Sequence, residues 1–496
     1  MLAAQDTQIS KQQYLDYCIS TANHLNGELV SFRTKWLERH KPDRSKGYAP
    51  PDREIYLAAL NANLFRITGD EKYLIPVKDI LLHYGEYKRH YPPDFHLARI
   101  EYGSSLPALP QAFSMRRYVS AYITLKGAAP LGEKETEIIE NNIAESADYL
   151  MRIQEWGPMN RAIICAEGLG LAAMALPQHA HAAEWKKMAG IIAEDNFRIL
   201  HMEDSQKYLL IWMYSMIHYA VDVHGDEMLL SQPMFSKWFG YLLDIFSPAG
   251  LIPDYGDADW GSSRFLCLPI FEEGAKLLKK GELRWAAARV FNKWIPGNPD
   301  NVHIAMVASD ACLWADFELG GSKPGGMAGT APDWIAKKIV FRSGWEDKST
   351  YLLLNYRDED DDAGVFLHYL RSTLAVNEEK LHHGHADENS ICLLMKNGSV
   401  LLHDGGYRDG IPSGKYGAYR ADYFHNRAVV RRIPAKKAEG VNLGKGLLAN
   451  IHNNGAYIKS QTEKTDHLIK GAFEMSRTRS MYPGNGYIYD RVLVYL

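Results

Sequence analysis

The sequence predicts a two-part fold, a long helical half followed by a β-rich half, and three observations support this prediction. Between about residues 10 and 315, apolar residues recur at spacings of three and four, with Pro and Gly between the segments. After a Gly-rich segment at 320–326, the pattern changes to short runs rich in β-branched and aromatic residues. The 496 residues are enough for two or three domains with substantial cores.

The helical half contains roughly a dozen amphipathic segments, of which 135–154 and 182–200 are clear examples. Paired helices arranged in a ring or a long bundle would need about this number of segments. We find no repeat of fixed length of the tetratricopeptide kind. We therefore expect one helical domain over 1–320, followed by a flexible linker at 321–334.

The β-rich half is expected to span 335–496. The letters KNGS at 396–399 predict a tight hairpin turn between two strands, because Asn-Gly favours such turns. The final run, 491–496, is typical of a strand in the middle of a sheet, and we expect the natural protein to continue beyond it. Four runs have the composition of strands: 338–341, 351–354, 391–395 and 428–430.

Composition and charge limit the possible partners. The net charge of −4 gives no basic field that would indicate nucleic acid or an anionic membrane. No run is long and apolar enough to span a bilayer. The 29 Tyr and 11 Trp suit stacking on sugar rings, although most are expected to pack in the core. Five widely spaced cysteines without a CxxC pair argue against a disulfide framework.

The start of the chain leaves localisation open. The apolar letters at 1–5 are too few for a signal peptide. The protein is therefore either the mature form of a periplasmic or secreted protein or a cytoplasmic one, and we favour the former.

Five histidines and two carboxylates gather in the β-rich half, in the segments HHGHAD (382–387), LLHDGG (401–406) and HN (425–426). Strand alternation lets His383 and His385 point to the same side, and a hairpin would bring Asp404 alongside. Together with His425, two imidazoles and one carboxylate suit a divalent transition metal such as zinc. The alternative is that these histidines are solvated groups beside Gly-rich turns.

These motifs resemble heparinase II/III-type polysaccharide lyases, including the related alginate and oligoalginate lyases. The resemblance rests on the segments 383–390, 397–398, 401–407 and 425–426, and it is strongest between 335 and 430. It implies an incomplete N-terminal (α/α) toroid followed by an antiparallel β-sandwich. It also implies β-elimination of a 4-linked uronate in an acidic polysaccharide or oligosaccharide, which leaves an unsaturated uronate end.

The resemblance also implies one zinc per chain, bound by His385, Asp404 and His425 with a structural role. His383 resembles the histidine that faces the substrate. The reaction removes the C5 proton and expels the C4 oxygen, so the site must neutralise the uronate carboxylate and supply a base and an acid.

In the helical half, the letters EWGPMNR at 155–161 resemble the helix start that carries an Asn-His pair. Asn160 would then hydrogen-bond the carboxylate of the substrate, and the alternative is that it caps the helix. Arg161 stands where relatives often have histidine. Arginine can clamp a carboxylate but cannot act as a base at neutral pH, and this departure widens the range of possible substrates.

Two tyrosines are candidates for proton transfer. Tyr214 fits best by its offset from Asn160, whereas Tyr208 and Tyr219 of the same segment have packing as their default role. Tyr416, on the loop before His425, is weakly favoured over Tyr419 as the second. Residues expected to contact the sugar are Tyr419, Trp260, Arg116 and Tyr102; a salt-bridged helix face is the alternative for Arg116, and plain loop structure for Trp260.

Two other functions remain open from the sequence. Helical toroids also host hydrolases with paired carboxylates, and Asp254, Asp257 and Asp259 offer such groups. A non-catalytic protein that binds acidic glycans is the second alternative, and Arg161 in place of histidine supports it. The sequence determines neither the uronate, nor the linkage, nor the oligomeric state.

Overall fold

The structure is a computed structural model, and it divides the chain into two compact units. The first unit comprises Met1–Arg198, Trp212–Gln232 and Leu268–Gly321, and the second comprises Ile199–Ile211, Pro233–Cys267 and Ser322–Leu496. The residues that the structure describes are 8–43, 47–92, 95, 106–153, 155, 157, 159–198, 205–258, 264–325, 338–356, 389–406, 425–428, 461–470, 473–482 and 487–495.

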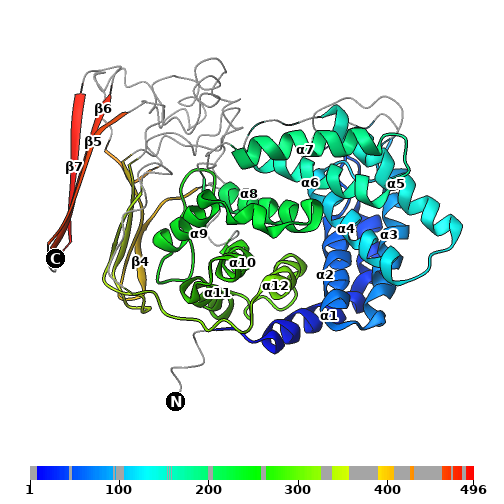
Figure 1. The fold of residues 1–496 in the computed structure, drawn as a ribbon, viewed down its shortest axis with the longest axis horizontal. Coiled ribbons are helices and arrows are strands. Elements are labelled where there is room, and N and C mark those ends of the chain that lie inside the picture. The colour runs from blue at the N-terminus through cyan, green and yellow to red at the C-terminus, as the bar shows by residue number, and fades with distance from the viewer. Residues whose placement is uncertain are drawn as a thin grey trace. The chain divides into compact units, whose positions relative to one another are not determined.

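Twelve α-helices lie within the described residues, and they confirm the predicted helical half (Figure 1). The segments predicted at 135–154 and 182–200 are α5 and α7. The bounds are α1 Lys11–Arg39, α2 Asp52–Thr68, α3 Leu74–Tyr84, α4 Ala112–Ala128, α5 Glu133–Arg152, α6 Asn160–Ala175, α7 Ala182–Arg198, α8 Gln206–His218, α9 Pro233–Ile245, α10 Cys267–Leu278, α11 Gly281–Trp294 and α12 Val302–Trp314.

Burial separates the helices of the first unit into an inner and an outer layer. Helix α6 buries 14 of its 16 residues and α12 buries 11 of 13, so both are enclosed on all sides. By contrast, α5 buries 7 of 20 residues and α1 buries 6 of 29, which is the single apolar stripe of an outer helix. The inner helices contact one another in the order α12, α2, α4, α6, and α1, α3, α5 and α7 pack outside them. This is the layering of an (α/α) toroid.

The inner helices run in the same direction. One outer helix lies between α2 and α4 in the sequence, and another lies between α4 and α6, so each inner helix returns to the orientation of the one before. Side-chain contacts align α12 with α2, because Tyr56 stacks on His303 near their starts while Asn63 bonds Asp310 further along. The N-termini of the inner helices therefore lie at one end of the toroid.

Helix α8 continues into a π-helical turn, Tyr219–His224. The turn lies against α6 so closely that a Cβ added at Gly170 would approach Val223 Cγ1 to 2.3 Å. A side chain at position 170 would force the two elements apart, since packed interiors leave no such space. π-Helical turns are rare and often occur at functional sites.

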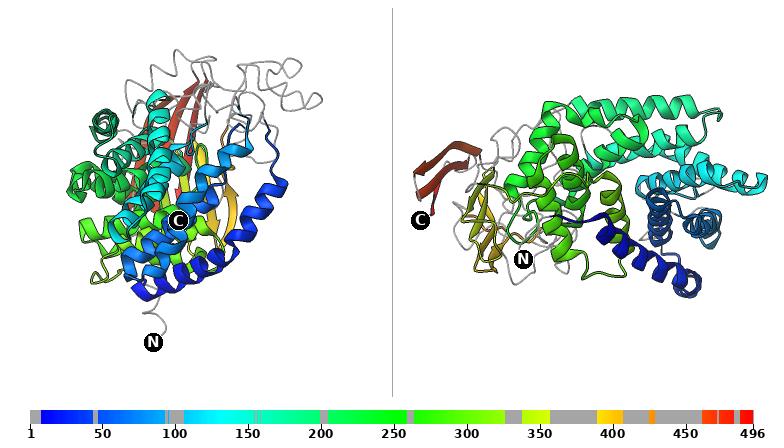
Figure 2. Two further views of the ribbon diagram at one scale, coloured as in Figure 1. Left: turned by 90° about the vertical axis from the view of Figure 1, so that its right-hand side faces the viewer. Right: turned by 60° about the horizontal axis from the view of Figure 1, so that its bottom comes forward.

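The second unit contains α9 and two antiparallel sheets, drawn in yellow and red in Figure 2. Leu493 of β7 packs against the core of the first sheet, which includes Ile339, Phe341 and Leu354, so the two sheets form a sandwich. The first sheet has the order β1-β2-β3-β4, and the second has the order β5-β6-β7. The strands are β1 Lys338–Arg342, β2 Tyr351–Asn355, β3 Ser390–Lys396, β4 Ser399–His403, β5 Gln461–Lys470, β6 Phe473–Tyr482 and β7 Tyr487–Tyr495.

The predicted hairpin turn lies between β3 and β4. Asn397 and Gly398 have φ values of 53° and 79°, the left-handed pair that a two-residue type I′ turn requires. The runs predicted at 338–341, 351–354 and 391–395 are β1, β2 and β3. Of the run predicted at 428–430, only Ala428 is described. The final run belongs to β7, which within the described strands lies at the edge of its sheet.

All five cysteines are free and buried. No helix in the described part of the chain is long and apolar enough to cross a membrane.

Candidate active site

The start of α6 places Asn160 and Arg161 at the end of the toroid where the inner helices begin. Met159 is the N-cap residue, with φ −149° and ψ 156°, so Asn160 is the first helical residue and does not cap the helix. The side chain of Asn160 is fully buried. Because helix N-termini carry partial positive charge, this end of the ring favours an anionic group such as a carboxylate.

Arg161 is the more accessible of the two. Its side chain is 28% exposed, and its Nε lies 3.1 Å from Glu155 Oε2. It lines a cavity of about 250 Å³ together with Gln111 and Phe113 at the start of α4. A single partly exposed ion pair of this kind is weak in water. Arg161 is therefore a cation that solvent can reach at this end of the ring, whereas its partner Glu155 is 9% exposed.

His303 and Tyr56 lie at the same end of the inner ring. Their rings stack with centroids 4.6 Å apart and planes 12° from parallel, and both residues are half-buried. Burial, with the nearby charges of Arg117 and Arg116, lowers the pKa of His303 to about 4. This imidazole is therefore neutral near pH 7 and adds no charge to the site.

Deeper in the ring, Tyr214 lies in a buried ionic network. Its hydroxyl accepts a hydrogen bond from Arg117 Nη2 at 2.7 Å and donates one to Asp310. The ring of His218 bridges the carboxylates of Asp222 and Asp310 through its two nitrogens, at 2.7 and 3.3 Å. Tyr214 is 2% exposed. The network joins α4, α8 and α12 and leaves the Tyr214 hydroxyl enclosed by protein.

The pKa values in this network follow from burial and from the charges. Burial opposes ionisation of Asp310, but His218 and Arg117 outweigh it and hold the pKa of that carboxyl well below its usual value. Burial and Arg117 act to lower the pKa of His218, yet Asp310 and Asp222 raise it overall. Burial also raises the pKa of Tyr214 well above 10. The network therefore favours a charged His218 and a neutral Tyr214.

Arg116, which we expected to contact the substrate, also faces inward. Its Nη1 donates to Glu167 Oε2 at 2.6 Å and to Ser215 Oγ at 2.9 Å. The residue is 5% exposed. This placement agrees with the salt-bridged alternative, because a buried arginine that is paired to a carboxylate is not accessible to a glycan.

Tyr208 is a candidate that sequence reasoning set aside as a packing residue. It lies in the first turn of α8, where its amide donates to Ser205 Oγ, and it is half-buried. Six residues separate it from Tyr214, which is about 9 Å along a helix axis. The sequence could have indicated that Tyr208 is accessible, because Tyr208 lies near the start of a predicted helix and helix ends are more accessible than helix middles. Tyr208 is therefore more accessible than Tyr214, which is 2% exposed.

Two of the three expected zinc ligands are in direct contact. His425 Nδ1 lies 2.7 Å from Asp404 Oδ2, and both side chains are buried. Asp404 Oδ1 accepts a hydrogen bond from the amide of Gly406 at 3.1 Å, which orients the carboxylate. A buried imidazole beside a buried carboxylate fits the donors that zinc prefers. Among the described residues no group of three or more His, Cys, Asp or Glu side chains is gathered for a metal ion.

Several expected site residues lie outside the described residues. They are His383, His385, Tyr416, Tyr419, Trp260 and Tyr102. Of the carboxylates considered for a hydrolase, Asp254 and Asp257 are buried, and Asp259 is not described.

Comparisons with solved structures identify the fold. The chain is similar to the crystal structure of heparinase III, with a TM-score of 0.53 and 16% identity over 90% of this chain and 62% of that one. It is also similar to a heparan sulfate lyase from Pedobacter heparinus (TM-score 0.46, 13% identity, 89% of this chain and 59% of that one). A further match is a heparinase III gene product (TM-score 0.49, 14% identity, 89% and 62%). No protein-family model and no curated protein matches the chain.

The chain thus has the fold of a heparinase III-type polysaccharide lyase, and the predicted order of a helical toroid and an antiparallel β domain is confirmed. At 16% identity the likeness identifies the fold alone. The chain spans about three-fifths of the length of the solved structures it matches, which is 62% for heparinase III.

Proposed function

We propose that this protein is a polysaccharide lyase that cleaves a 4-linked uronate in an acidic polysaccharide or oligosaccharide by β-elimination. The observation that carries the proposal is the placement of Asn160 and Arg161 where the inner helices begin, in a chain with the heparinase III fold. Helix N-termini, an amide and an accessible guanidinium together provide a site for one carboxylate.

The reaction needs that carboxylate to be neutralised. Removal of the C5 proton places charge on the neighbouring carboxylate, and the C4–O bond then breaks as a C4=C5 double bond forms. Arg161 pairs with the carboxylate and stabilises the developing enolate-like charge, while Asn160, buried beside it, remains a contact predicted from the sequence. When substrate binds, the Arg161 guanidinium leaves Glu155 and pairs with the substrate carboxylate, and its 28% exposure lets the substrate reach it.

A tyrosine of α8 carries a proton in this proposal. Tyr208 is half-buried near the start of the helix, whereas the hydroxyl of Tyr214 is bonded to Arg117 and Asp310. We therefore assign proton transfer to the leaving C4 oxygen to Tyr208, and we assign Tyr214 to the support of the inner helices. His383 and the loop tyrosine Tyr416 remain partners predicted from the sequence, and in this proposal His383 accepts the C5 proton.

The zinc site is a further part of the proposal. His385, Asp404 and His425 would hold one zinc ion, which would supply no more than a fixed position for the loops that carry its ligands, because elimination needs no activated water. Purified protein should contain about one zinc per chain, and His385→Ala should lose metal and thermal stability together. Metal analysis and a melting curve test this, and a metal-free protein with unchanged melting would exclude the site.

The decisive experiment is a panel of acidic polymers: alginate, glucuronan, heparan sulfate, chondroitin sulfate, hyaluronan, ulvan and gellan. Elimination on any of them produces the ultraviolet absorbance of an unsaturated uronate. New reducing ends without that absorbance would instead indicate the hydrolase alternative. Polymer binding without new ends of either kind would indicate the non-catalytic alternative.

A further inference from the structure

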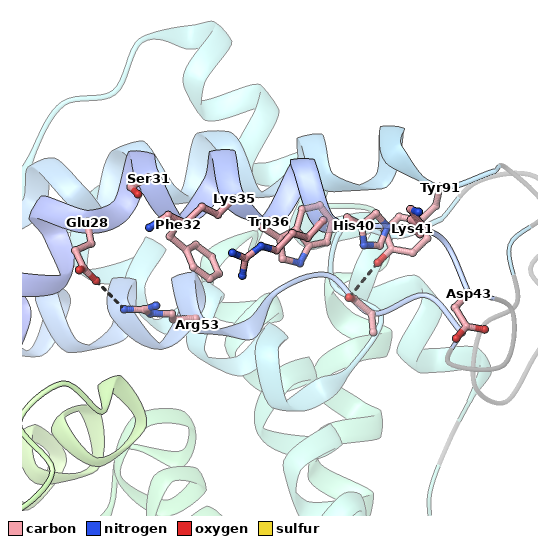
Figure 3. A pocket seen from close by; sticks show the side chains of 13 residues that line it. Glu28, Ser31, Phe32, Lys35, Trp36, His40, Lys41, Asp43, Arg53 and Tyr91 are labelled. Atoms are coloured by element: carbon pink, nitrogen blue, oxygen red, sulfur yellow. Dashed lines mark hydrogen bonds and ion pairs between the residues drawn. The ribbon is translucent and has the colours of Figure 1, made fainter.

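A large cavity lies between one face of α1 and the start of α2. Its volume is about 750 Å³, and we call it the α1 pocket. One wall is formed by Glu28, Phe32, Lys35 and Arg39, which follow spacings of three and four and therefore share a helix face. The facing wall includes Arg53 at the start of α2 (Figure 3).

Basic side chains outnumber acidic ones around the α1 pocket. Four basic residues line it (Lys35, Arg39, Lys41 and Arg53), against two acidic residues (Glu28 and Asp43). Arg53 pairs with Glu28 at 3.4 Å and lies 5.1 Å from the centre of the Phe32 ring. Lys35, Arg39 and Lys41 are exposed. After the Arg53–Glu28 pair is set aside, three cations remain against one carboxylate, which favours an anionic ligand.

An ordered set of aromatic rings lies at one end of the α1 pocket. The half-buried Trp36 stacks on His40 with ring centroids 4.1 Å apart, and its edge contacts Tyr87 at 4.7 Å. His40 in turn lies 4.6 Å from Tyr91. Burial, with His90, lowers the pKa of His40, so this ring remains neutral. Packing holds the indole in place before a ligand arrives, which reduces the entropy lost on binding a sugar ring.

The ordinary explanation for basic residues here is the helix dipole, because cations stabilise helix C-termini. It applies to Arg39, which is the basic residue in the last turn of α1. It does not account for Lys35, a full turn earlier, or for Lys41, beyond the helix end. It also does not account for a cavity with an ordered aromatic wall.

The α1 pocket and the Arg161 cavity are separate but adjacent. They share no lining residue. The ring of Tyr91, which lines the α1 pocket, contacts the ring of Tyr48, which lines the Arg161 cavity, with centroids 4.7 Å apart. The two cavities therefore lie next to each other, separated by these two rings.

We propose that the α1 pocket is a second binding site for an acidic oligosaccharide segment, with carboxylate or sulfate groups paired to Lys35, Arg39 and Lys41 and a sugar ring against Trp36. The inference rests on the proposed function for the identity of the ligand, a stretch of the same polymer that reaches the Arg161 cavity. Its role is to hold a long substrate, so it acts on affinity and not on the chemical step.

The test compares two triple variants of equal charge. Lys35→Ala/Arg39→Ala/Lys41→Ala removes the free cations of the α1 pocket. The control, Lys134→Ala/Lys186→Ala/Lys187→Ala, removes three exposed lysines of α5 and α7. Affinity electrophoresis in alginate and in heparin, with uncharged dextran as a blank, measures binding. We expect the pocket variant to bind at least one acidic polymer about tenfold more weakly than the control does, the combined worth of a few exposed ion pairs.

Equal weakening in the two variants, or no weakening, would overturn the α1 pocket as a site, as would wild-type protein that binds neither polymer. Melting curves should match, because the substituted residues are exposed. The outcome for the reaction is separate. Binding that depends on the α1 pocket without elimination would support the pocket and overturn the lyase. Elimination by the pocket variant with an unchanged KM for the polymer would support the lyase and overturn the α1 pocket.

Discussion

The arginines of the toroid form two groups that differ in what surrounds them. Arg116 and Arg117 lie in the second turn of α4, are about 5% exposed or less, and are paired to Glu167 and Asp310. Arg161 lies at the start of α6, is 28% exposed, and has Glu155 as its ion-pair partner. The same side chain therefore supports the fold in one place and is available to a ligand in the other.

The difference shows that burial among neighbouring helices decides the role of an arginine in this fold. In the middle of the ring, unpaired charge is costly, so every charged group has partners on neighbouring helices. At the N-terminal end, water and the helix dipoles reduce that cost, and a group can change partners when substrate arrives. The tyrosines of α8 repeat the contrast, with Tyr214 in the middle and Tyr208 at the start.

The largest effect should come from the two tyrosines. Tyr208→Phe should keep the melting temperature and lower kcat by about 10² to 10⁴, the usual worth of a general acid or base. Tyr214→Phe should instead lower the free energy of unfolding by about 1 to 3 kcal/mol, since Arg117 and Asp310 lose a buried partner. Steady-state kinetics and urea denaturation of both variants measure this. The reverse pattern would assign catalysis to Tyr214, as its offset from Asn160 predicted.

Removal of one charge from the buried network should be the next largest effect. Asp310→Asn leaves Arg117 and His218 without their shared carboxylate and should cost about 3 to 5 kcal/mol of stability. The control is Glu194→Gln, which breaks the exposed pair with Arg198 and should cost about 0.5 kcal/mol or less. Denaturant midpoints and slopes of the two variants check the comparison. Similar losses would show that the network is not the main support of the inner helices.

The same network should make stability depend on pH. The pKa of His218 is raised in the folded state, so its contribution is complete below its ordinary value of 6.5 and is lost as pH rises through the folded value. The free energy of unfolding should fall above pH 6.5 by up to about 1.4 kcal/mol per pH unit for this one proton. Asp310 has a depressed pKa, so its contribution is lost only in strong acid. Denaturation at several pH values measures this dependence. In His218→Gln the free energy of unfolding should no longer fall as pH rises above 6.5.

The smallest effect should come from the accessible arginine. Arg161→Lys keeps the positive charge but cannot form a bidentate hydrogen-bonded pair with a carboxylate. KM should therefore rise roughly tenfold and kcat should fall. The pH optimum should not move, because arginine does not titrate in this range. A pH–rate profile of the variant is the measurement. A shifted acidic limb would show that Arg161 is coupled to the group that titrates.

Local patterns were sufficient for much of the fold. Apolar spacing predicted α5 and α7, and the Asn397-Gly398 pair predicted the turn between β3 and β4, because each depends on the conformational preferences of a few adjacent residues. The resemblance also assigned Asp404 and His425 to one ligand set, and the structure has these two side chains in contact.

By itself, then, the sequence determined the helical and β-rich halves and the turn. It did not determine which helices are inner, that Met159 and not Asn160 caps α6, or that Arg116 and Tyr214 are buried. These features depend on contacts between helices far apart in the chain, such as Arg117 of α4 with Asp310 of α12. Periodicity gives the face of a helix that is buried, but only packing against neighbours decides how far along the helix a side chain remains accessible to a ligand.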